Sequence, residues 1–128
     1  MVFKLKFDAM KIIVAGSRDF NDYELLKSRL SLCLKDAADI EIVSGTAKGA
    51  DRLGELYANE NNLKLKKFPA DWNRYGKQAG YLRNKQMAEY ATHCICFWDG
   101  KSKGTKMMID LANINNLKTE IVKFLPTF

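Results

Sequence analysis

Short apolar segments alternate with helical patterns along this chain, and that alternation constrains its fold more than any other feature. The apolar segments cover residues 11–15, 39–43, 63–68, 93–98 and 119–124. The first of them lacks polar alternation, which is typical of a strand buried on both faces. Helical patterns cover residues 21–35, 48–61, 81–90 and 103–115. The order βαβαβαβαβ predicts an α/β protein whose mainly parallel, five-stranded sheet is covered by helices on both faces.

The 128 residues suit one domain, which we expect to span residues 11–128. Residues 1–10 form either an edge strand or an N-terminal extension, because residues 2–7 alternate like a strand while Met10 resembles a natural start. Asn21 is expected to cap the first helix, with Glu24 three residues later in a capping-box pattern. Residues 70–80 are expected to form a long, functional loop.

Composition restricts the cellular setting. No apolar run approaches the ~18 residues of a membrane helix or resembles a signal peptide, so neither a membrane partner nor export is expected. Three cysteines, an odd number, favour a reducing compartment, and we expect a cytoplasmic location. Cys94 and Cys96 share one face of a strand without the usual zinc spacing. We interpret them as buried thiols and expect no metal site.

Polar, glycine-rich stretches follow the first four predicted strands, whereas the connections that precede the second, third and fifth strands are plain. The stretches are residues 16–18, 44–51, 71–83 and 97–106. Ligands of open α/β sheets bind outside the carboxyl ends of the strands. The asymmetry therefore places the chemistry at one edge of one sheet. The last stretch opens a helix with two glycines, two hydroxyls and three lysines between Phe97 and Lys106, a composition that favours an anion.

These stretches supply the candidate ligand-binding residues. They are Gly16, Ser17, Arg18, Ser44, Gly45, Thr46, Gly49, Asp51, Asp71, Trp72, Arg74, Arg83, Trp98, Gly100, Ser102, Gly104 and Thr105. We expect Ser102, Gly104, Thr105 and Arg83 to hold phosphate, since arginine and helix N-termini both bind it. Residues 16–17 and 44–46 would approach a sugar or phosphate through their backbone.

Several candidates have an equally simple structural interpretation. Trp72 and Tyr75 either pack under their loop or stack on a base, and Trp98 is either a core residue or a stacking wall. Asp51 lies in the first turn of a predicted helix, where it stabilises the helix dipole whether or not it contacts a ligand. The glycines of residues 44–49 fit neither a P-loop nor a dinucleotide-binding fingerprint. No cofactor is expected.

Five ordered motifs resemble the YspA-type branch of the SLOG superfamily, found in bacteria and phages. They are residues 13–20, 44–51, 69–72, 79–87 and 97–105, so the resemblance covers about residues 11–124. It implies a Rossmann-like three-layer α/β/α sandwich that binds a nucleotide or a related phosphorylated ligand. It also adds Asn84, which follows Arg83, to the candidate ligand-binding residues. Homo-oligomers are common among related folds, so we expect one here.

Relatives in this superfamily include the DNA-processing protein A domain and the Lonely Guy phosphoribohydrolases, which cleave the bond between a base and ribose 5′-monophosphate. Gly104 and Thr105 match the Gly-Thr pair of their phosphate motif, but Met108 stands where their catalytic glutamate would be. Cleavage needs a carboxylate, which methionine cannot replace. Asp51, Asp71 and Asp99 are the candidate substitutes.

The sequence therefore predicts a protein that binds a small nucleotide-type ligand, as a sensor or by sequestering it. A nucleotide N-glycosidase is the alternative. Single-stranded nucleic-acid binding is a third interpretation, favoured by the net charge of +6 and by the Lys/Arg/aromatic stretch at residues 71–83. We rank it last and do not expect a nucleic-acid partner, because glycine, serine and threonine loops form a pocket for a compact anion.

Overall fold

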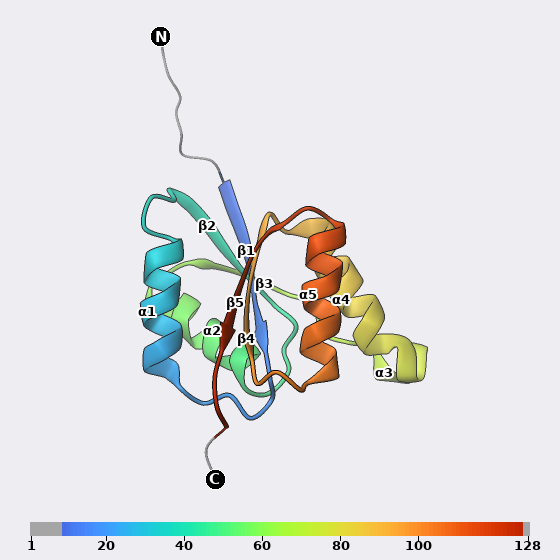
Figure 1. The fold of residues 1–128 in the computed structure, drawn as a ribbon. Coiled ribbons are helices and arrows are strands. Elements are labelled where there is room, and N and C mark those ends of the chain that lie inside the picture. The colour runs from blue at the N-terminus through green and yellow to red at the C-terminus, as the bar shows by residue number, and fades with distance from the viewer. Residues whose placement is uncertain (1–8, 127–128) are drawn as a thin grey trace.

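The computed structural model describes residues 9–126 and contains one five-stranded sheet whose strands all run parallel (Figure 1). The strand order is β3-β2-β1-β4-β5, which the sequence pattern alone does not specify. The strands are β1 (Ala9–Gly16), β2 (Asp39–Ser44), β3 (Lys64–Lys67), β4 (His93–Trp98) and β5 (Lys118–Lys123). The predicted α/β class and parallel sheet are confirmed.

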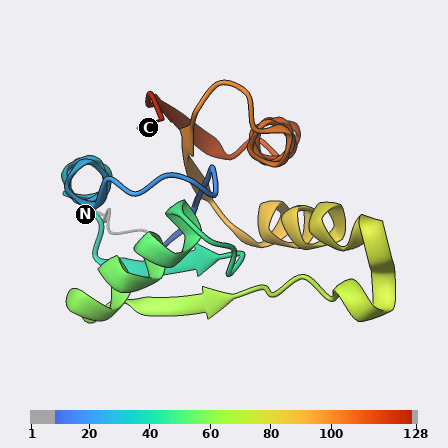
Figure 2. The same cartoon turned by 90° about the horizontal axis from the view of Figure 1, so that it is seen from below.

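Helices cover both faces of this sheet and complete the three-layer, Rossmann-like sandwich (Figure 2). One layer holds α1 (Tyr23–Cys33) and α2 (Ala50–Glu60), and the other holds α4 (Ala79–Tyr90) and α5 (Lys103–Ile114). Before α4, the chain forms a short helix α3 (Trp72–Tyr75) and a 3₁₀ turn η1 (Gly76–Gln78).

The central strand β1 packs against both helical layers. Successive side chains of a strand point to opposite faces. Ile12 and Val14 accordingly belong to the core under α1 and α2, whereas Ile13 and Ala15 belong to the core under α4 and α5. Each fully buried side chain of this kind contributes about 1.5–3 kcal/mol. The expectation of a strand buried on both faces is confirmed for residues 12–15.

The first helix, α1, begins at Tyr23, and its N-cap lies one residue after the expected Asn21. Asp22, not Asn21, is the N-cap, and its carboxylate accepts a hydrogen bond of 3.0 Å from the backbone N–H of Leu25. The Asn21 prediction was therefore wrong by one position. Asparagine and aspartate cap helices about equally well, so two adjacent candidates cannot be separated by propensity.

The expected long loop at residues 70–80 is mostly helical. Asp71 caps α3 by accepting a 3.2 Å hydrogen bond from the N–H of Arg74, and α4 begins at Ala79 instead of residue 81. The loop prediction was wrong because a helix of four residues has almost no intrinsic stability and leaves no periodic signal. The Asp71 cap and the connection to α4 fix the position of α3 instead.

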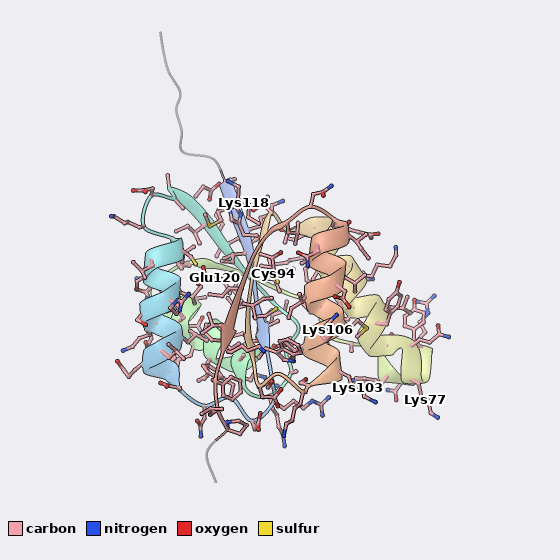
Figure 3. All side chains as sticks on the ribbon, in the orientation of Figure 1. Lys77, Cys94, Lys103, Lys106, Lys118 and Glu120 are labelled. Atoms are coloured by element: carbon pink, nitrogen blue, oxygen red, sulfur yellow. The ribbon has the colours of Figure 1, made fainter. Side chains whose placement is uncertain are left out.

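The two neighbouring cysteines lie inside the molecule, as expected. Cys94 and Cys96 are buried in β4 with their sulfur atoms 3.5 Å apart, and Figure 3 shows Cys94 near the middle of the molecule. Within residues 9–126, no group of three or more histidine, cysteine or acidic side chains could hold a metal ion.

The N-terminal prediction falls largely outside the described residues. Ala9 and Met10 extend β1, while the choice between an edge strand and an extension concerns residues 1–8 and stays open. The division into residues 1–10 and one domain of residues 11–128 likewise stays a prediction. None of the helices in the described part of the chain is long and apolar enough to cross a membrane.

Candidate ligand-binding site

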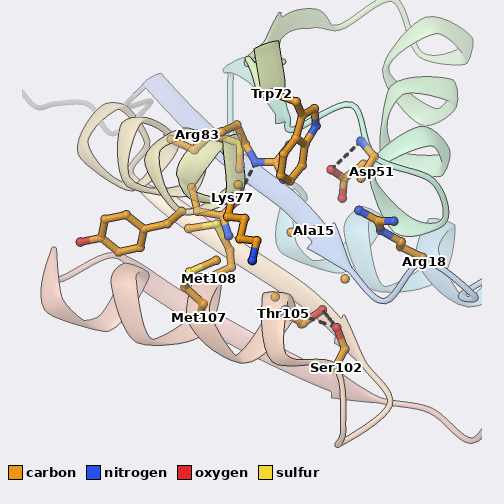
Figure 4. Close-up of a pocket in the computed structure, with 17 residues that line it drawn as sticks. Ala15, Arg18, Asp51, Trp72, Lys77, Arg83, Ser102, Thr105, Met107 and Met108 are labelled. Atoms are coloured by element: carbon orange, nitrogen blue, oxygen red, sulfur yellow. Dashed lines mark hydrogen bonds between the residues drawn. The ribbon is translucent and has the colours of Figure 1, made fainter. Parts of the chain in front are cut away.

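A cavity of about 330 Å³ opens at the carboxyl ends of the strands, beside the point where the strand order reverses. The chain proceeds from β1 through β2 to β3 on one side and returns to β4 and β5 on the other, so the loops after β1 and β4 diverge there. The cavity is lined by Ala15, Gly16, Arg18, Ala47, Asp51, Trp72, Lys77, Gly80, Tyr81, Arg83, Asn84, Met87, Ser102, Gly104, Thr105, Met107 and Met108 (Figure 4).

The first turn of α5 forms one wall of this cavity. Ser102 is the N-cap of α5. Its hydroxyl oxygen accepts a 3.4 Å hydrogen bond from the backbone N–H of Thr105 and a 3.1 Å hydrogen bond from the Thr105 hydroxyl. A side chain at Gly104 would meet no atom within 4 Å, so the backbone there faces open space. An anion could approach the positive end of this helix dipole directly.

The loop before α5 is held in place by its own polar groups. One carboxylate oxygen of Asp99 accepts hydrogen bonds from the N–H groups of Lys101 at 2.9 Å and Ser102 at 2.8 Å. These bonds lower the pKa of Asp99, the Ser102 bond most strongly. The indole N–H of Trp98 donates to the Ser102 carbonyl at 3.0 Å. The wall is therefore preformed.

The α4 wall carries a half-buried arginine, Arg83, beside a buried amide, Asn84. The Arg83 guanidinium donates to the Gly45 carbonyl and, at 2.8 Å, to the Asn84 side-chain oxygen. Burial lowers the pKa of Arg83, and the charge of Asp51 opposes that shift. Asn84 is 6% exposed and lines the cavity. Its amide nitrogen has no hydrogen-bond partner within residues 9–126 and so can serve a ligand.

Asp51 is the only carboxylate among the described residues that line the cavity. It is 5% exposed, and its carboxylate accepts a 3.1 Å hydrogen bond from the N–H of Ala47. Burial raises the pKa of Asp51 to about 6, against the opposing effects of the Ala47 bond and the Arg83 charge. A carboxyl with this pKa can exchange protons near neutral pH.

A glycine lets these two charged side chains approach one another. A β-carbon at Gly45 would lie 2.8 Å from a terminal nitrogen of Arg83 and 2.9 Å from a carboxylate oxygen of Asp51. Both contacts are too short for any real side chain. A side chain at this position would therefore displace the ends of the Arg83 and Asp51 side chains.

Sequence reasoning missed the apolar end of the cavity. Figure 4 shows Met107 and Met108 across the cavity from Asp51 and Arg18. The helical repeat could have found most of this end, because Met107 and Met108 follow Gly104 by three and four residues and Met87 follows Arg83 by four. Lys77 and Tyr81 also line the cavity. Lys77 lies in the turn η1, which carries no such signal, whereas Tyr81 lies in α4, three residues before Asn84.

A second cavity, of about 360 Å³, adjoins the first and contains two more of the expected residues, Gly45 and Thr46. It is also lined by Lys48, Arg52, Pro69 and Ala70. Four residues line both cavities, namely Arg18, Ala47, Trp72 and Arg83. Most of the loop after β2 thus faces this second space, and Ala47 faces both.

Two of the expected hydroxyls support the loops instead of lining either cavity. Ser17 is buried, and its oxygen accepts a 3.2 Å hydrogen bond from the N–H of Asp99. Ser44 is fully buried, donates to Glu55 at 2.6 Å and accepts from the N–H of Thr46 at 3.0 Å. Ser17 thus connects the loop after β1 to the loop after β4, and Ser44 connects the end of β2 to α2.

The remaining expected residues also lie outside the two cavities. Asp71 caps α3, Arg74 lies over the ring of Tyr75, and Trp98 holds the Ser102 carbonyl. Gly100 is exposed, whereas Gly49 packs under the backbone of residues 17 and 18. Of the three aspartates considered as catalytic substitutes, only Asp51 lines the main cavity among the described residues.

Comparisons with known proteins agree with this fold. The family model described as the YspA, cpYpsA-related SLOG family matches residues 10–75, from β1 to the end of α3. Gene 61 protein of Mycobacterium phage D29 is 31% identical over 103 residues, which cover 75% of this chain and 82% of that protein. The chain belongs to the YspA, cpYpsA-related SLOG family.

Proposed function

We propose that this protein binds a nucleotide or a nucleotide-derived phosphorylated ligand in the main cavity. The observation that carries this proposal is the convergence of the α5 N-terminus with Arg18 and Arg83 on one cavity. A phosphate at Gly104 would accept hydrogen bonds from the helix N-terminus and gain the helix dipole. The guanidinium groups would supply charge-assisted bonds, which are about twice as strong as neutral ones.

The opposite end of the cavity suits the base or sugar of such a ligand. Tyr81, Met107 and Met108 offer apolar surface, and Trp72 offers an indole face beside Arg83. Sulfur and aromatic side chains pack well against flat rings. Of the expected stacking residues, only Trp72 lines the cavity in the described part of the chain, so it is the proposed wall for the base.

The α5 wall supports binding more than turnover. Met108 is 1% exposed and lines the cavity where a Lonely Guy-type enzyme would carry its glutamate. A thioether neither activates water nor stabilises an oxocarbenium ion. We therefore propose a role in sensing the ligand or in sequestering it.

Calorimetric titration with a panel of nucleotides and ADP-ribose-type ligands tests this proposal. We expect at least one ligand to bind and Arg83→Gln to weaken its binding by about tenfold or more. Arg18→Gln, on an exposed side chain, repeats the test without risk to the core. Arg74→Gln is the matched control, because Arg74 lines neither cavity. No response to the whole panel, or equal losses in all three variants, would exclude the proposal.

A nucleotide N-glycosidase is the second candidate, and the buried carboxyl of Asp51 is the observation that favours it. In such a reaction water attacks the anomeric carbon, the bond to the base breaks, and the base leaves with a proton. Asp51 would accept the proton from water, for which its pKa of about 6 is suited.

Incubation with nucleoside 5′-monophosphates, followed by chromatography for free base, decides between the two candidates. The hydrolase predicts release of base that Asp51→Asn reduces by about a hundredfold or more. A preparation that binds a nucleotide but releases no base supports the binding role.

A further inference from the structure

The second cavity differs from the main one in its charge. It is lined by the cationic side chains of Arg18, Lys48, Arg52 and Arg83, and by no acidic side chain among the described residues. The main cavity, by contrast, is lined by the acidic side chain of Asp51 as well as by cationic side chains. The two spaces adjoin along Arg18, Trp72 and Arg83, so one ligand can reach both.

None of the four cationic side chains that line this second cavity forms an ion pair within 4.0 Å in the described residues, although the charge of Asp51 acts on Arg52 and Arg83 from the main cavity. Within residues 9–126, neither Arg18, Lys48 nor Arg52 has a carboxylate within 4.0 Å, whereas six other basic side chains form such ion pairs. The charge of Arg18 lowers the pKa of Arg83, an effect smaller than that of burial and than that of the opposing Asp51 charge. Arg18, Lys48 and Arg52 therefore line this cavity without an ion-pair partner in the described part of the chain, and an anion there would be attracted by all three.

From this arrangement we propose that the second cavity binds a further phosphate group of the same ligand, so that the preferred ligand is a nucleoside diphosphate or an ester of one. This inference rests on the proposed function of the main cavity. The first phosphate lies at the N-terminus of α5. The second lies between Lys48, Arg52 and the shared guanidinium of Arg18.

The local structure is suited to hold such a group. The Nε–H of Arg52 donates to the Thr46 carbonyl at 3.2 Å, which fixes the root of the guanidinium and leaves its terminal nitrogens available. Lys48 is exposed and forms no ion pair in the described part of the chain, so it can move toward an anion. Trp72, at the boundary of the two cavities, limits how the connecting chain of the ligand can pass.

Calorimetric titration with the four common nucleoside 5′-monophosphates and the matching 5′-diphosphates, in the presence of EDTA, tests the inference. We expect the diphosphate of the preferred base to bind about tenfold tighter than its monophosphate. Lys48→Ala and Arg52→Gln should each remove most of that advantage and leave the monophosphate affinity within about twofold. Arg52→Lys should retain part of it.

Lys35→Ala is the matched control, because Lys35 is exposed in the connection before β2, at the other edge of the sheet. It should change neither affinity. Equal binding of monophosphate and diphosphate, or an advantage that survives in both variants, would overturn the second-phosphate site while the nucleotide function stands. Binding of none of the eight nucleotides, and of none of the ADP-ribose-type ligands in the wider panel, would overturn both.

Discussion

Among the charged residues of the main cavity, Asp51 and Arg83 are the two whose pKa is shifted by burial. Both lie close to Gly45, and Asp51 is buried whereas Arg83 is half-buried. Burial alone would favour the neutral form of each, and their mutual attraction opposes that preference. For Asp51 the effect of burial is the larger one, which raises its pKa from the ordinary value of 3.8 to about 6.

The first prediction concerns the pH dependence of stability. Between the two pKa values of Asp51, the folded state holds a proton that the unfolded state releases, so this group makes the wild type less stable as the pH rises. The Asp51→Asn variant has no titrating group at this position, so it does not lose stability in this way as the pH rises. Its free energy of unfolding, relative to wild type, should rise by roughly 2–3 kcal/mol from about pH 4 to about pH 7. Urea denaturation at a series of pH values measures the difference, and a flat difference would contradict the prediction.

The second prediction compares two glycines of positive φ. Gly49 has a φ of 79°, and a β-carbon there would lie 2.3 Å from the Ser17 carbonyl oxygen. Gly76 has a φ of 56°, with no atom within 4 Å of the same point. Gly49→Ala should therefore cost about 3 kcal/mol or more, and Gly76→Ala about 1 kcal/mol. Chemical denaturation of both variants tests this, and equal losses would show that packing at Gly49 is not decisive.

The residue types did not separate the side chains that line the main cavity from those that support its loops. Arg83, Ser102 and Thr105 line the main cavity as expected. Ser17, Ser44 and Asp99 carry the same polar groups but use them on neighbouring backbone. A hydroxyl or carboxylate can serve either purpose, and tertiary packing decides between them.

At the scale of elements, the N-terminus of α5 is the part of the site most dependent on a single side chain. Ser102 caps the helix and also lies at the cavity. Ser102→Ala should cost about 1 kcal/mol of stability because the N–H of Thr105 loses its acceptor. Thermal or urea unfolding measures this loss.

Ser28→Ala is the control for that prediction. Ser28 lies inside α1, where its hydroxyl donates back to the Leu25 carbonyl, and alanine is the better helix former. We expect no loss of stability there. Equal losses of stability in both variants would mean that the Ser102 cap stabilises the protein no more than an ordinary serine inside a helix.

Periodic elements were predictable, whereas short ones were not. The five apolar segments and the four long helices appear where the sequence predicts them, to within about two residues at each end. The helix α3 and the turn η1 escaped prediction, because seven residues of helical turn depend on the Asp71 cap and on α4 rather than on their own pattern. Their position matters, since they bring Trp72 and Lys77 to the cavity.

At the scale of the whole molecule, the parallel sheet was predictable but its strand order was not. Strands β1 and β4 are adjacent although 76 residues separate Gly16 from His93. Apolar segments that are buried on both faces pair equally well with several neighbours. The order places the loops after β1 and β4 at opposite sides of one opening, and that geometry creates the cavity.

The homo-oligomer expected from related folds stays a prediction at this scale. Several large apolar side chains are exposed on different elements, among them Leu32, Tyr81 and Ile114. Light scattering on the purified chain should give a multiple of its 14.6 kDa mass. A single-chain mass at every concentration tested would contradict the expectation.

The central claim is that the carboxyl edge of the sheet binds a phosphorylated ligand, and a crystal structure with a bound nucleotide tests it most directly. The account predicts phosphate oxygens within hydrogen-bond distance of the Gly104 N–H and of the guanidinium of Arg18 or Arg83, with the base beside Trp72 or Tyr81. A nucleotide bound elsewhere, such as in the hollow between Phe20 and Phe124, with the cavity residues untouched, would contradict it.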